Sequence, residues 1–338
     1  PVLRSGYLLY FLPVNFLKIA RVLGQLPPDE LVSGKVRVLD LGSGPGTSAL
    51  GVMAFYADLL AKKKIKDAWL DFTLLDLNFN ILKDARALHD AYAQELSKQP
   101  GFHSLCSAKN FDFTRGGMGR FLRNFKYHLV ILSNVINEFR SREAAADLIE
   151  EILTHHLDPK GKIVIIEPAL QKTSQDLQHL RDEIVVNRKK GMVLAPCLHQ
   201  EECPLNVVNI RDWCHFYLPW ECPPIIEKTD KLIGNRKEWL QLSYLVLGKN
   251  VPERSPSTWR VISNPMPSKG KKELVLCGPP GRYHITRLDK NATATNRIFD
   301  EIKRGDLIEL DIGPPAPYRV DGEFAVTDKT RLKIISRT

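Results

Sequence analysis

A glycine-rich turn that directly follows a buried strand is the feature that most constrains how this chain folds. Residues 38–47 read VLDLGSGPGT, and the turn holds glycines at Gly42, Gly44 and Gly46. Glycine adopts positive φ angles and allows a ligand to approach the backbone closely. The helix expected after the turn points its N-terminus at the bound group. The segment therefore predicts an α/β fold with a ligand site at one edge of its sheet.

Strand-like apolar segments alternate with helical patterns over much of the chain. We expect strands at 35–41, 69–75, 107–113, 127–132, 162–166 and 240–247. We expect helices from the turn to about Lys63, at 81–97, 144–155 and 173–189, and a first group that ends at Pro27–Pro28. This alternation predicts a parallel sheet with helices on both faces. The apolar segment Tyr7–Leu17 is interrupted by Pro13 and Asn15, so we expect an amphipathic helix pair too short to cross a bilayer, and no membrane partner.

The charge of the chain favours an acidic partner. The 338 residues carry a formal net charge of +9, and nucleic acid is the usual partner of such a protein. After a Pro/Ser-rich linker at 251–268, short β-like runs predict a small β-rich C-terminal domain. That part, 251–338, holds 16 Lys/Arg against 11 Asp/Glu, so five of the nine excess positive charges lie there. Candidate phosphate contacts are the runs 188–190, 269–272 and 303–304, each of which is alternatively a solvated face.

The glycine turn resembles motif I of class I S-adenosylmethionine methyltransferases. In those enzymes an acid at the position of Asp40 lies near the methionine amino group. Asp76 ends the next strand, where a Rossmann-like fold places the acid that holds ribose hydroxyls. Asp112 ends the expected third strand, where an acid often accepts from the adenine amino group. The resemblance implies S-adenosylmethionine bound by Asp40, Gly42, Gly44, Gly46, Asp76, Asp112 and Asn134; the alternative is that the acids are ordinary turn residues.

A catalytic residue is not recognisable. The fourth strand runs into ILSNVINEF, without the Asn/Asp-Pro-Pro-aromatic motif of amino-group methyltransferases and without the cysteine nucleophile of cytosine C5 enzymes. Asn134, Asn137 and Glu138 either line the pocket mouth or cap the following helix. The sequence therefore supports cofactor binding better than methyl transfer.

Six cysteines are too few for a disulfide scaffold, and four of them have the spacing of metal ligands. Cys197, Cys203, Cys214 and Cys277 are separated by five, ten and sixty-two residues. Four thiolates suit an iron–sulfur cluster or zinc. A Cys3His zinc site with His199 or His215 is an alternative, and so is Cys222 as the fourth ligand, which closes a shorter loop.

The chain resembles the methyltransferase-like family of small-ribosomal-subunit assembly factors, which occurs in bacteria and mitochondria. The matching segments are residues 39–47, 195–199, 203–205, 212–216, 242–244 and 274–280. In that family three clustered cysteines and one C-terminal cysteine hold a 4Fe-4S cluster, which implies Cys197, Cys203, Cys214 and Cys277 as ligands here. Cys222 and Cys106 fall outside the pattern. The family commonly has proline after its first cysteine, where this chain has Leu198.

The resemblance implies a Rossmann-like class I methyltransferase fold with three parts. These are N-terminal helices (1–34), a methyltransferase-like domain (35–250) with a cysteine-rich insertion at about 191–224, and a basic β-rich domain (251–338). The expected function is binding of small-subunit rRNA by a monomer during assembly of the small ribosomal subunit, in the mitochondrial matrix or the bacterial cytoplasm. The alternatives are an active rRNA methyltransferase and a zinc-stabilised RNA-binding module.

Overall fold

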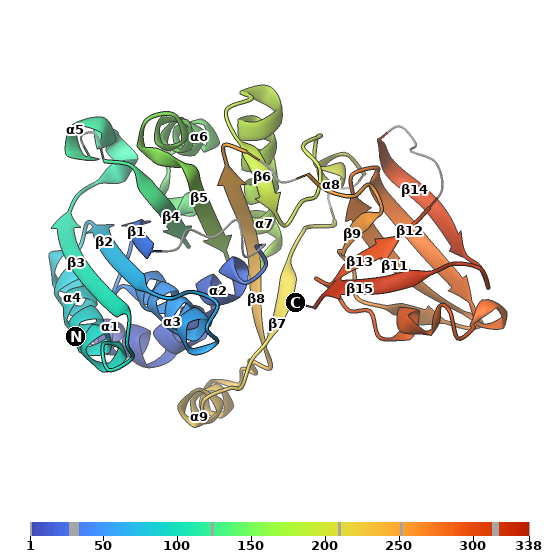
Figure 1. Cartoon of the computed structure of the whole chain (residues 1–338), viewed down its shortest axis with the longest axis horizontal. Helices are drawn as coiled ribbons and strands as arrows, with labels where there is room; N and C mark the ends of the chain where they lie inside the picture. Colours follow the sequence, from blue (N-terminus) through green and yellow to red (C-terminus); the bar gives the residue numbers. More distant parts are fainter. Residues whose placement is uncertain are drawn as a thin grey trace.

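Two β-sheets form the two ends of an elongated molecule. The computed structural model describes residues 2–26, 34–122, 125–208, 211–250, 253–312 and 318–337. The N-terminal α/β part and the smaller C-terminal β part lie side by side along the long axis (Figure 1). The predicted helix end at Pro27–Pro28 lies outside the described residues.

The first sheet has eight strands in the order β3-β2-β1-β4-β5-β8-β6, and β7 pairs with β8. Strands β1 to β5 are parallel, whereas β8 runs antiparallel to β5. Their bounds are β1 Gly34–Leu41, β2 Ala68–Asp76, β3 Phe102–Asn110, β4 Tyr127–Ser133, β5 Leu157–Glu167, β6 Met192–Ala195, β7 Phe216–Pro219 and β8 Trp239–Gly248. The predicted Rossmann-like class I fold is confirmed. The reversal of strand order beside β1 brings the ends of β1, β2 and β4 to one edge, where such folds bind ligands.

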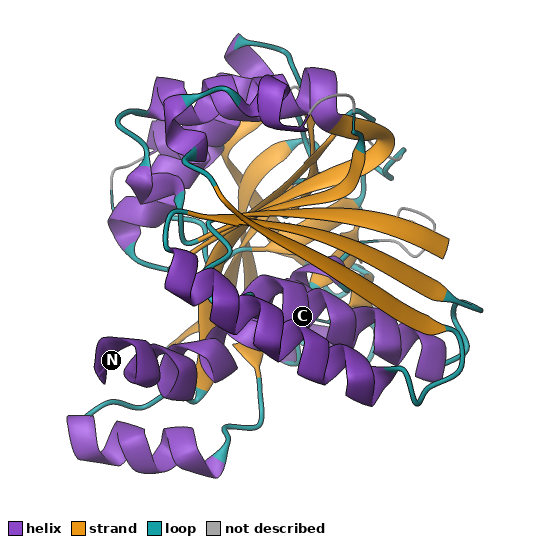
Figure 2. Cartoon of the chain, turned by 90° about the vertical axis from the view of Figure 1, so that its left-hand side faces the viewer, coloured by secondary structure: helices purple, strands orange, loops and turns teal. Residues whose placement is uncertain are grey.

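Helices cover both faces of this sheet, as Figure 2 shows. Strand β1 explains why: Val36 and Val38 enter the core shared with α2, α3 and α4, while Leu39 and Leu41 enter the core shared with α5, α6 and α7. The helices are α1 Val2–Gly6, α2 Leu12–Leu23, α3 Thr47–Ala61, α4 Phe79–Leu96, α5 Met118–Leu122, α6 Arg142–Glu151, α7 Gln171–Asp182, α8 Pro204–Val208 and α9 Pro224–Ile233. π-Helical turns at Tyr7–Phe11, Ile152–His156 and Glu183–Asn187 join α1 to α2 and extend α6 and α7.

The N-terminal helix is longer than the predicted pair. Pro13 lies in the first turn of α2, where its missing N–H breaks no hydrogen bond within α2. The π-helical turn Tyr7–Phe11 before it connects α1 and α2 into one helix. The helix Arg4–Leu23 has 20 residues and is apolar enough to cross a membrane by length and composition. Mostly buried core helices and N-terminal signal sequences pass the same test; here 28% of the tested part of the helix is buried, with Ile19 and Val22 in the core shared with α3.

The second sheet has seven strands in the order β14-β12-β11-β9-β13-β15, with β10 on β11. Trp259 and Phe299 are fully buried in its separate core. Its strands are β9 Thr258–Val261, β10 Met266–Ser268, β11 Lys271–Gly278, β12 Gly281–Leu288, β13 Leu307–Leu310, β14 Arg319–Val326 and β15 Leu332–Ser336.

Two expectations about individual elements are wrong, and two short strands were not predicted. The third strand begins at Phe102 and ends at Asn110, so Asp112 lies beyond it as the N-cap of the 3-10 turn Phe113–Arg115. The segment 251–268 is not only linker, because β9 and β10 lie in it. The cysteine-rich segment holds β6 and β7, whose four residues each are too few to show a period. Both pair with β8, a strand that lies later in the sequence and supplies the hydrogen bonds that stabilise them.

Candidate functional site

The glycine turn adopts the conformation that its sequence predicts. Gly42, Gly44 and Gly46 all have positive φ angles, and α3 begins directly after Gly46. A Cβ atom on Gly42 would lie 2.4 Å from Cγ1 of Val135, which follows β4. Only glycine therefore lets the turn pack against the end of β4, and the turn is fixed between β1, β2 and β4.

Asp40 is a buried acid next to this turn. It is 1% exposed, and its Oδ2 atom has no hydrogen-bond partner in the part of the chain that the structure describes. Burial, followed by the nearby charge of Asp76, raises the pKa of Asp40 to about 8. The hydroxyl of Ser43 in the turn is also buried and, within the described residues, unpaired. The backbone of Ala49 donates to this carboxyl, so the buried Oδ2 atom is the acceptor left for a ligand amino group.

Asp76 and Asp112 accept hydrogen bonds from their own surroundings. The Asp76 carboxylate accepts from the backbone N–H of Gly44 at 2.9 Å and of Asn78 at 2.8 Å, so it ties the glycine turn to the end of β2. Asp112 accepts from the backbone N–H and the hydroxyl of Thr114, and the hydroxyl contact does most to lower its pKa. Burial raises the pKa of Glu138, and the nearby charges of Asp76 and Asp112 raise it further. Both acids therefore lie near this partly buried carboxyl.

Asn134 does not cap a helix. It follows β4 with a φ angle of +59°, and its N–H donates to the carbonyl of Ile166 at 2.8 Å. The helix α6 is capped by Ser141, and the 3-10 turn Ile136–Glu138 has no side-chain cap. The helix-capping interpretation is therefore wrong for Asn134, and its position at the pocket mouth stays a prediction.

A cavity of about 270 Å³ lies beside the ends of β4 and β5. It is lined by Asn137 and by Glu167, the last residue of β5. Glu167 accepts from the backbone N–H of Val135 at 3.1 Å and of Ile136 at 3.0 Å, and burial raises its pKa to about 7. Sequence reasoning did not single out Glu167, although an acid at the end of a parallel strand is the signal that identified Asp76.

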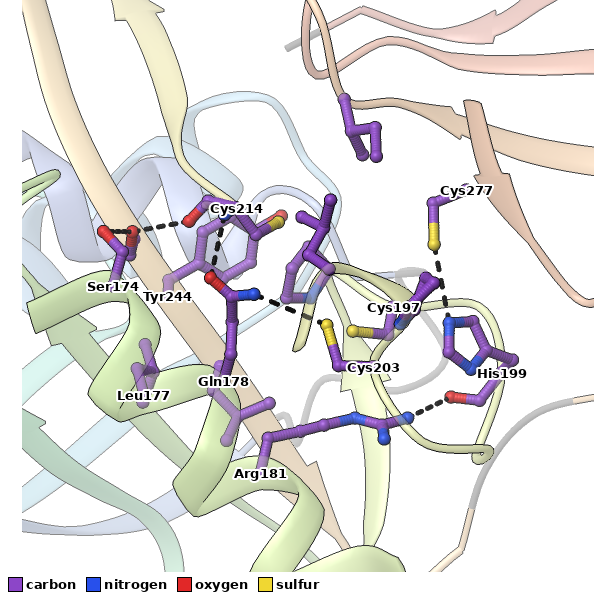
Figure 3. Close-up of a pocket in the computed structure, with 16 residues that line it drawn as sticks. Ser174, Leu177, Gln178, Arg181, Cys197, His199, Cys203, Cys214, Tyr244 and Cys277 are labelled. Carbon is purple, nitrogen blue, oxygen red and sulfur yellow. Dashed lines mark hydrogen bonds between the residues drawn. The ribbon is translucent and has the colours of Figure 1, made fainter. Parts of the chain in front are cut away.

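Four cysteines line one cavity of about 40 Å³. Figure 3 shows how their side chains lie around it. Cys197 follows β6, Cys203 precedes α8 and Cys214 precedes β7, whereas Cys277 belongs to β11 of the second sheet. His199 lies among them, with its Nε2 atom 3.4 Å from the Cys277 sulfur. Burial, and then the neighbouring cysteines, raise the pKa of Cys277. The four predicted ligands thus line the same cavity, and their binding of one metal centre stays a prediction.

Polar side chains hold the backbone around these thiols. The N–H of Cys203 donates to Asp182 at 3.0 Å, and the N–H of Cys214 donates to Gln178 at 3.0 Å. Gln178 also donates to the Cys203 sulfur at 3.6 Å, and Arg181 donates to the carbonyl of His199 at 2.9 Å. All three side chains come from α7, so one helix positions the cysteine loop. Within the described residues, no three His, Cys, Asp or Glu side chains are grouped closely enough to hold a metal ion.

One protein family matches residues 4–308, and its description is "Mitochondrial small ribosomal subunit Rsm22". The chain belongs to the Rsm22 family. This confirms the resemblance drawn from the cysteine and glycine motifs. Comparison with curated proteins found no match.

Solved structures similar to this Rsm22-family chain include several methyltransferases. A SAM-dependent methyltransferase from Methanosarcina mazei is 9% identical, covering 66% of this chain and 96% of its own, with a TM-score of 0.37. The glycopeptide N-methyltransferase MtfA in complex with sinefungin is 11% identical (70% and 94% covered, TM-score 0.36). An arsenic(III) S-adenosylmethionine methyltransferase from Chlamydomonas reinhardtii is 18% identical (73% and 83% covered, TM-score 0.35).

The other two cysteines and His215 do not line the thiol cavity of this Rsm22-family protein. Cys222 packs beside the core near α9, with its sulfur 3.8 Å from the carbonyl of Pro223, and Cys106 lies in β3. His215 contacts Trp213 and Tyr217 instead. Of the alternatives drawn from the sequence, His199 is the one that lines the cavity.

The predicted phosphate-binding runs differ in how available their charges are. Arg188 forms ion pairs with Asp147, Glu150 and Glu183, so acids of the same protein already neutralise it. Lys271 and Lys272 pair with Glu273 and Asp300. Arg304 instead turns toward the cysteine-rich segment, where it donates to the carbonyl of His215 at 3.2 Å.

Proposed function

We propose that this Rsm22-family protein binds S-adenosylmethionine and a 4Fe-4S cluster, and that it binds small-subunit rRNA while the small ribosomal subunit assembles. The observation that carries the proposal is that four cysteines, three from the loops of the cysteine-rich segment and one from β11 of the second sheet, line a single cavity. A soft four-thiolate donor set matches a cubane cluster. The family description and the excess of positive charge support the ribosomal partner, and the same description supports the mitochondrial matrix over the bacterial cytoplasm.

The residues that line the cavity have the donor type that a cluster requires, and they come from two separate parts of the chain. Cys197, Cys203, Cys214 and Cys277 would supply one thiolate each, and the cluster would neutralise charges that burial disfavours. Because Cys277 belongs to the other sheet, this shared centre would hold the two sheets in one orientation. Zinc bound by three cysteines and His199 is the competing assignment, which the contact between His199 and Cys277 supports.

Metal analysis of anaerobically purified protein tests this assignment. A brown protein with a broad visible band near about 400 nm contains iron and sulfide, whereas a zinc protein is colourless. We expect Cys277→Ser to lose iron and Cys222→Ser to keep it. Metal loss in Cys222→Ser alone would overturn the ligand set, and stoichiometric zinc without iron would favour the zinc-stabilised module.

The glycine turn carries the cofactor assignment. The N-terminus of α3 and the backbone of the turn would face the nucleotide, while the Asp40 Oδ2 atom, unpaired within the described residues, would accept from the methionine amino group. Asp76, Asp112 and Asn134 would lie around the ribose, the adenine and the pocket mouth. Titration calorimetry with S-adenosylhomocysteine tests this: Asp40→Asn should weaken binding, while the exposed control Asp58→Asn, which lies on α3 and pairs with Lys62, should not.

An active rRNA methyltransferase is the second candidate, because the 270 Å³ cavity beside β4 and β5 has room for an acceptor group. Incorporation of tritiated methyl groups into small-subunit rRNA distinguishes the two functions. Transfer by the wild-type protein that disappears in Asp76→Ala would favour the enzyme. RNA binding without any transfer would favour the assembly factor.

A further inference from the structure

A second cavity lies at the junction between the two sheets, beside the cysteines. It has a volume of about 390 Å³, which is in the range of small-ligand sites. Leu205 and Ile262 line both this junction cavity and the thiol cavity, so one layer of side chains separates them. The proposed cofactor site and cluster do not account for the junction cavity.

One wall of the junction cavity is aromatic. Trp213 and His215 lie on either side of Cys214 in the sequence, and both line the cavity. Their rings are stacked, with centroids 5.2 Å apart and planes inclined by 27°. The indole N–H of Trp213 donates to the carbonyl of Ala169 at 3.1 Å, which fixes the orientation of the ring. Trp213 therefore offers a preformed surface for a planar group, while the His215 ring already contacts the Arg304 guanidinium at 3.2 and 3.3 Å.

The second sheet supplies the basic side of the cavity. Arg304 and Arg282 both line it, and the Nε–H group of each is buried without a hydrogen-bond partner among the described residues. His284 also lines the cavity, 2.9 Å from the Arg282 guanidinium. The acid that lines it is the half-exposed Asp212, 3.9 Å from Arg282, and Arg282 also pairs with Asp321 outside the cavity. Two guanidinium groups thus face a single lining carboxylate, which favours an anionic ligand.

We propose that the junction cavity binds one unstacked nucleotide of single-stranded RNA, with the base against the Trp213–His215 wall and a phosphate against Arg304 and Arg282. The inference rests on the proposed rRNA binding and names the place where it occurs. Aromatic rings beside arginine are the combination by which proteins hold bases that are free of a duplex. Because the aromatic wall flanks Cys214, a centre that holds this cysteine also positions the wall.

Fluorescence anisotropy with a fluorescein-labelled single-stranded oligouridylate tests the proposal. Arg304→Gln should weaken binding about tenfold and reduce the slope of log affinity against log salt by about one. The matched control is Arg319→Gln, an exposed arginine of the same sheet outside the cavity, and it should have a much smaller effect. Trp213→Ala should weaken binding more than Trp213→Phe, which keeps an aromatic surface. A fully base-paired RNA duplex should compete poorly with the oligouridylate for binding.

Photocrosslinking keeps the test independent of folding defects in the variants. With wild-type protein and a 5-iodouridine oligonucleotide, we expect crosslinks in the peptide that contains Trp213 and His215. Crosslinks confined to other segments, or equal effects of Arg304→Gln and Arg319→Gln, would overturn the cavity assignment while leaving rRNA binding in place. An absence of any binding to the oligouridylate or to small-subunit rRNA would overturn both.

Discussion

The glycine turn and the thiol cavity differ in how far apart in the sequence their parts lie. Residues 40–47 form most of the turn in one continuous segment. The thiol cavity needs Cys277, which lies in the second sheet, sixty-two residues after Cys214. The first site is therefore a property of one strand, turn and helix, whereas the second exists only where two sheets meet. Changes that affect the contact between the sheets should affect the thiol cavity first.

Removal of the distant ligand should have the largest effect. Cys277→Ser should strip the metal and destabilise the protein by about 4 kcal/mol, because metal binding and folding are coupled. Anaerobic thermal unfolding and iron analysis measure both effects. Cys222→Ser is the matched control, since this thiol lies outside the cavity. Equal losses in the two variants would remove the distinction between a cavity ligand and an ordinary cysteine.

The buried acid at the glycine turn should make stability depend on pH. Burial is the main reason that the pKa of Asp40 is raised to about 8 in the folded protein. As the pH rises, the unfolded chain therefore loses this proton at a lower pH than the folded protein does. Its contribution to stability is therefore highest below about pH 4 and declines as the pH rises toward about 8. Without ligand, Asp40→Asn should be more stable than wild type by about 3 kcal/mol at about pH 8, with little difference at about pH 4.

Urea unfolding of both proteins across this pH range measures the difference. A stability difference that is independent of pH would show that the Asp40 carboxyl does not titrate in the folded protein, and the wild-type pKa argument would then fail.

Two glycines of the turn should respond differently to alanine. Gly42→Ala combines a φ angle of +67° with a contact at 2.4 Å to Val135, and should destabilise by about 3 kcal/mol. Gly44→Ala has a φ angle of +51° and no atom within 4 Å of the new Cβ, so about 1 kcal/mol is expected. Urea unfolding compares them. A smaller loss in Gly42→Ala than in Gly44→Ala would contradict the close packing of the turn on the end of β4.

Loss of a basic residue far from both sites should affect RNA binding least. Arg188 belongs to a basic run, yet Asp147, Glu150 and Glu183 occupy its guanidinium group. Arg188→Gln should leave the affinity for the oligouridylate within about twofold of wild type while reducing stability by about 1 kcal/mol. A tenfold loss of affinity would show that the ion pairs open to admit RNA.

The sequence predicted elements that carry their own signal. The strands β1, β2 and β4 are rich in apolar residues and the turn has three glycines, so their predicted bounds differ from the observed ones by one residue at most. The strand predicted at 162–166 is part of β5, which begins five residues earlier, at Leu157. The strands β6 and β7 were missed because each has four residues and depends on hydrogen bonds to β8, a strand that follows later in the chain. Asp112 was placed in a strand because the apolar pattern continued past the real end at Asn110.

Residue types and spacing by themselves determined the Rossmann-like core, the glycine turn and the three clustered cysteines Cys197, Cys203 and Cys214, because each is encoded in local pattern or in chemistry. Only the tertiary structure decided which arginines remain available, since Asp147 and Glu150, which are distant in the sequence, pair with Arg188, whereas Arg304 reaches across to the cysteine-rich segment. It also decided that Cys277, and not Cys222, joins the other three thiols. Burial and pairing depend on where separate segments pack together, and no local pattern records that.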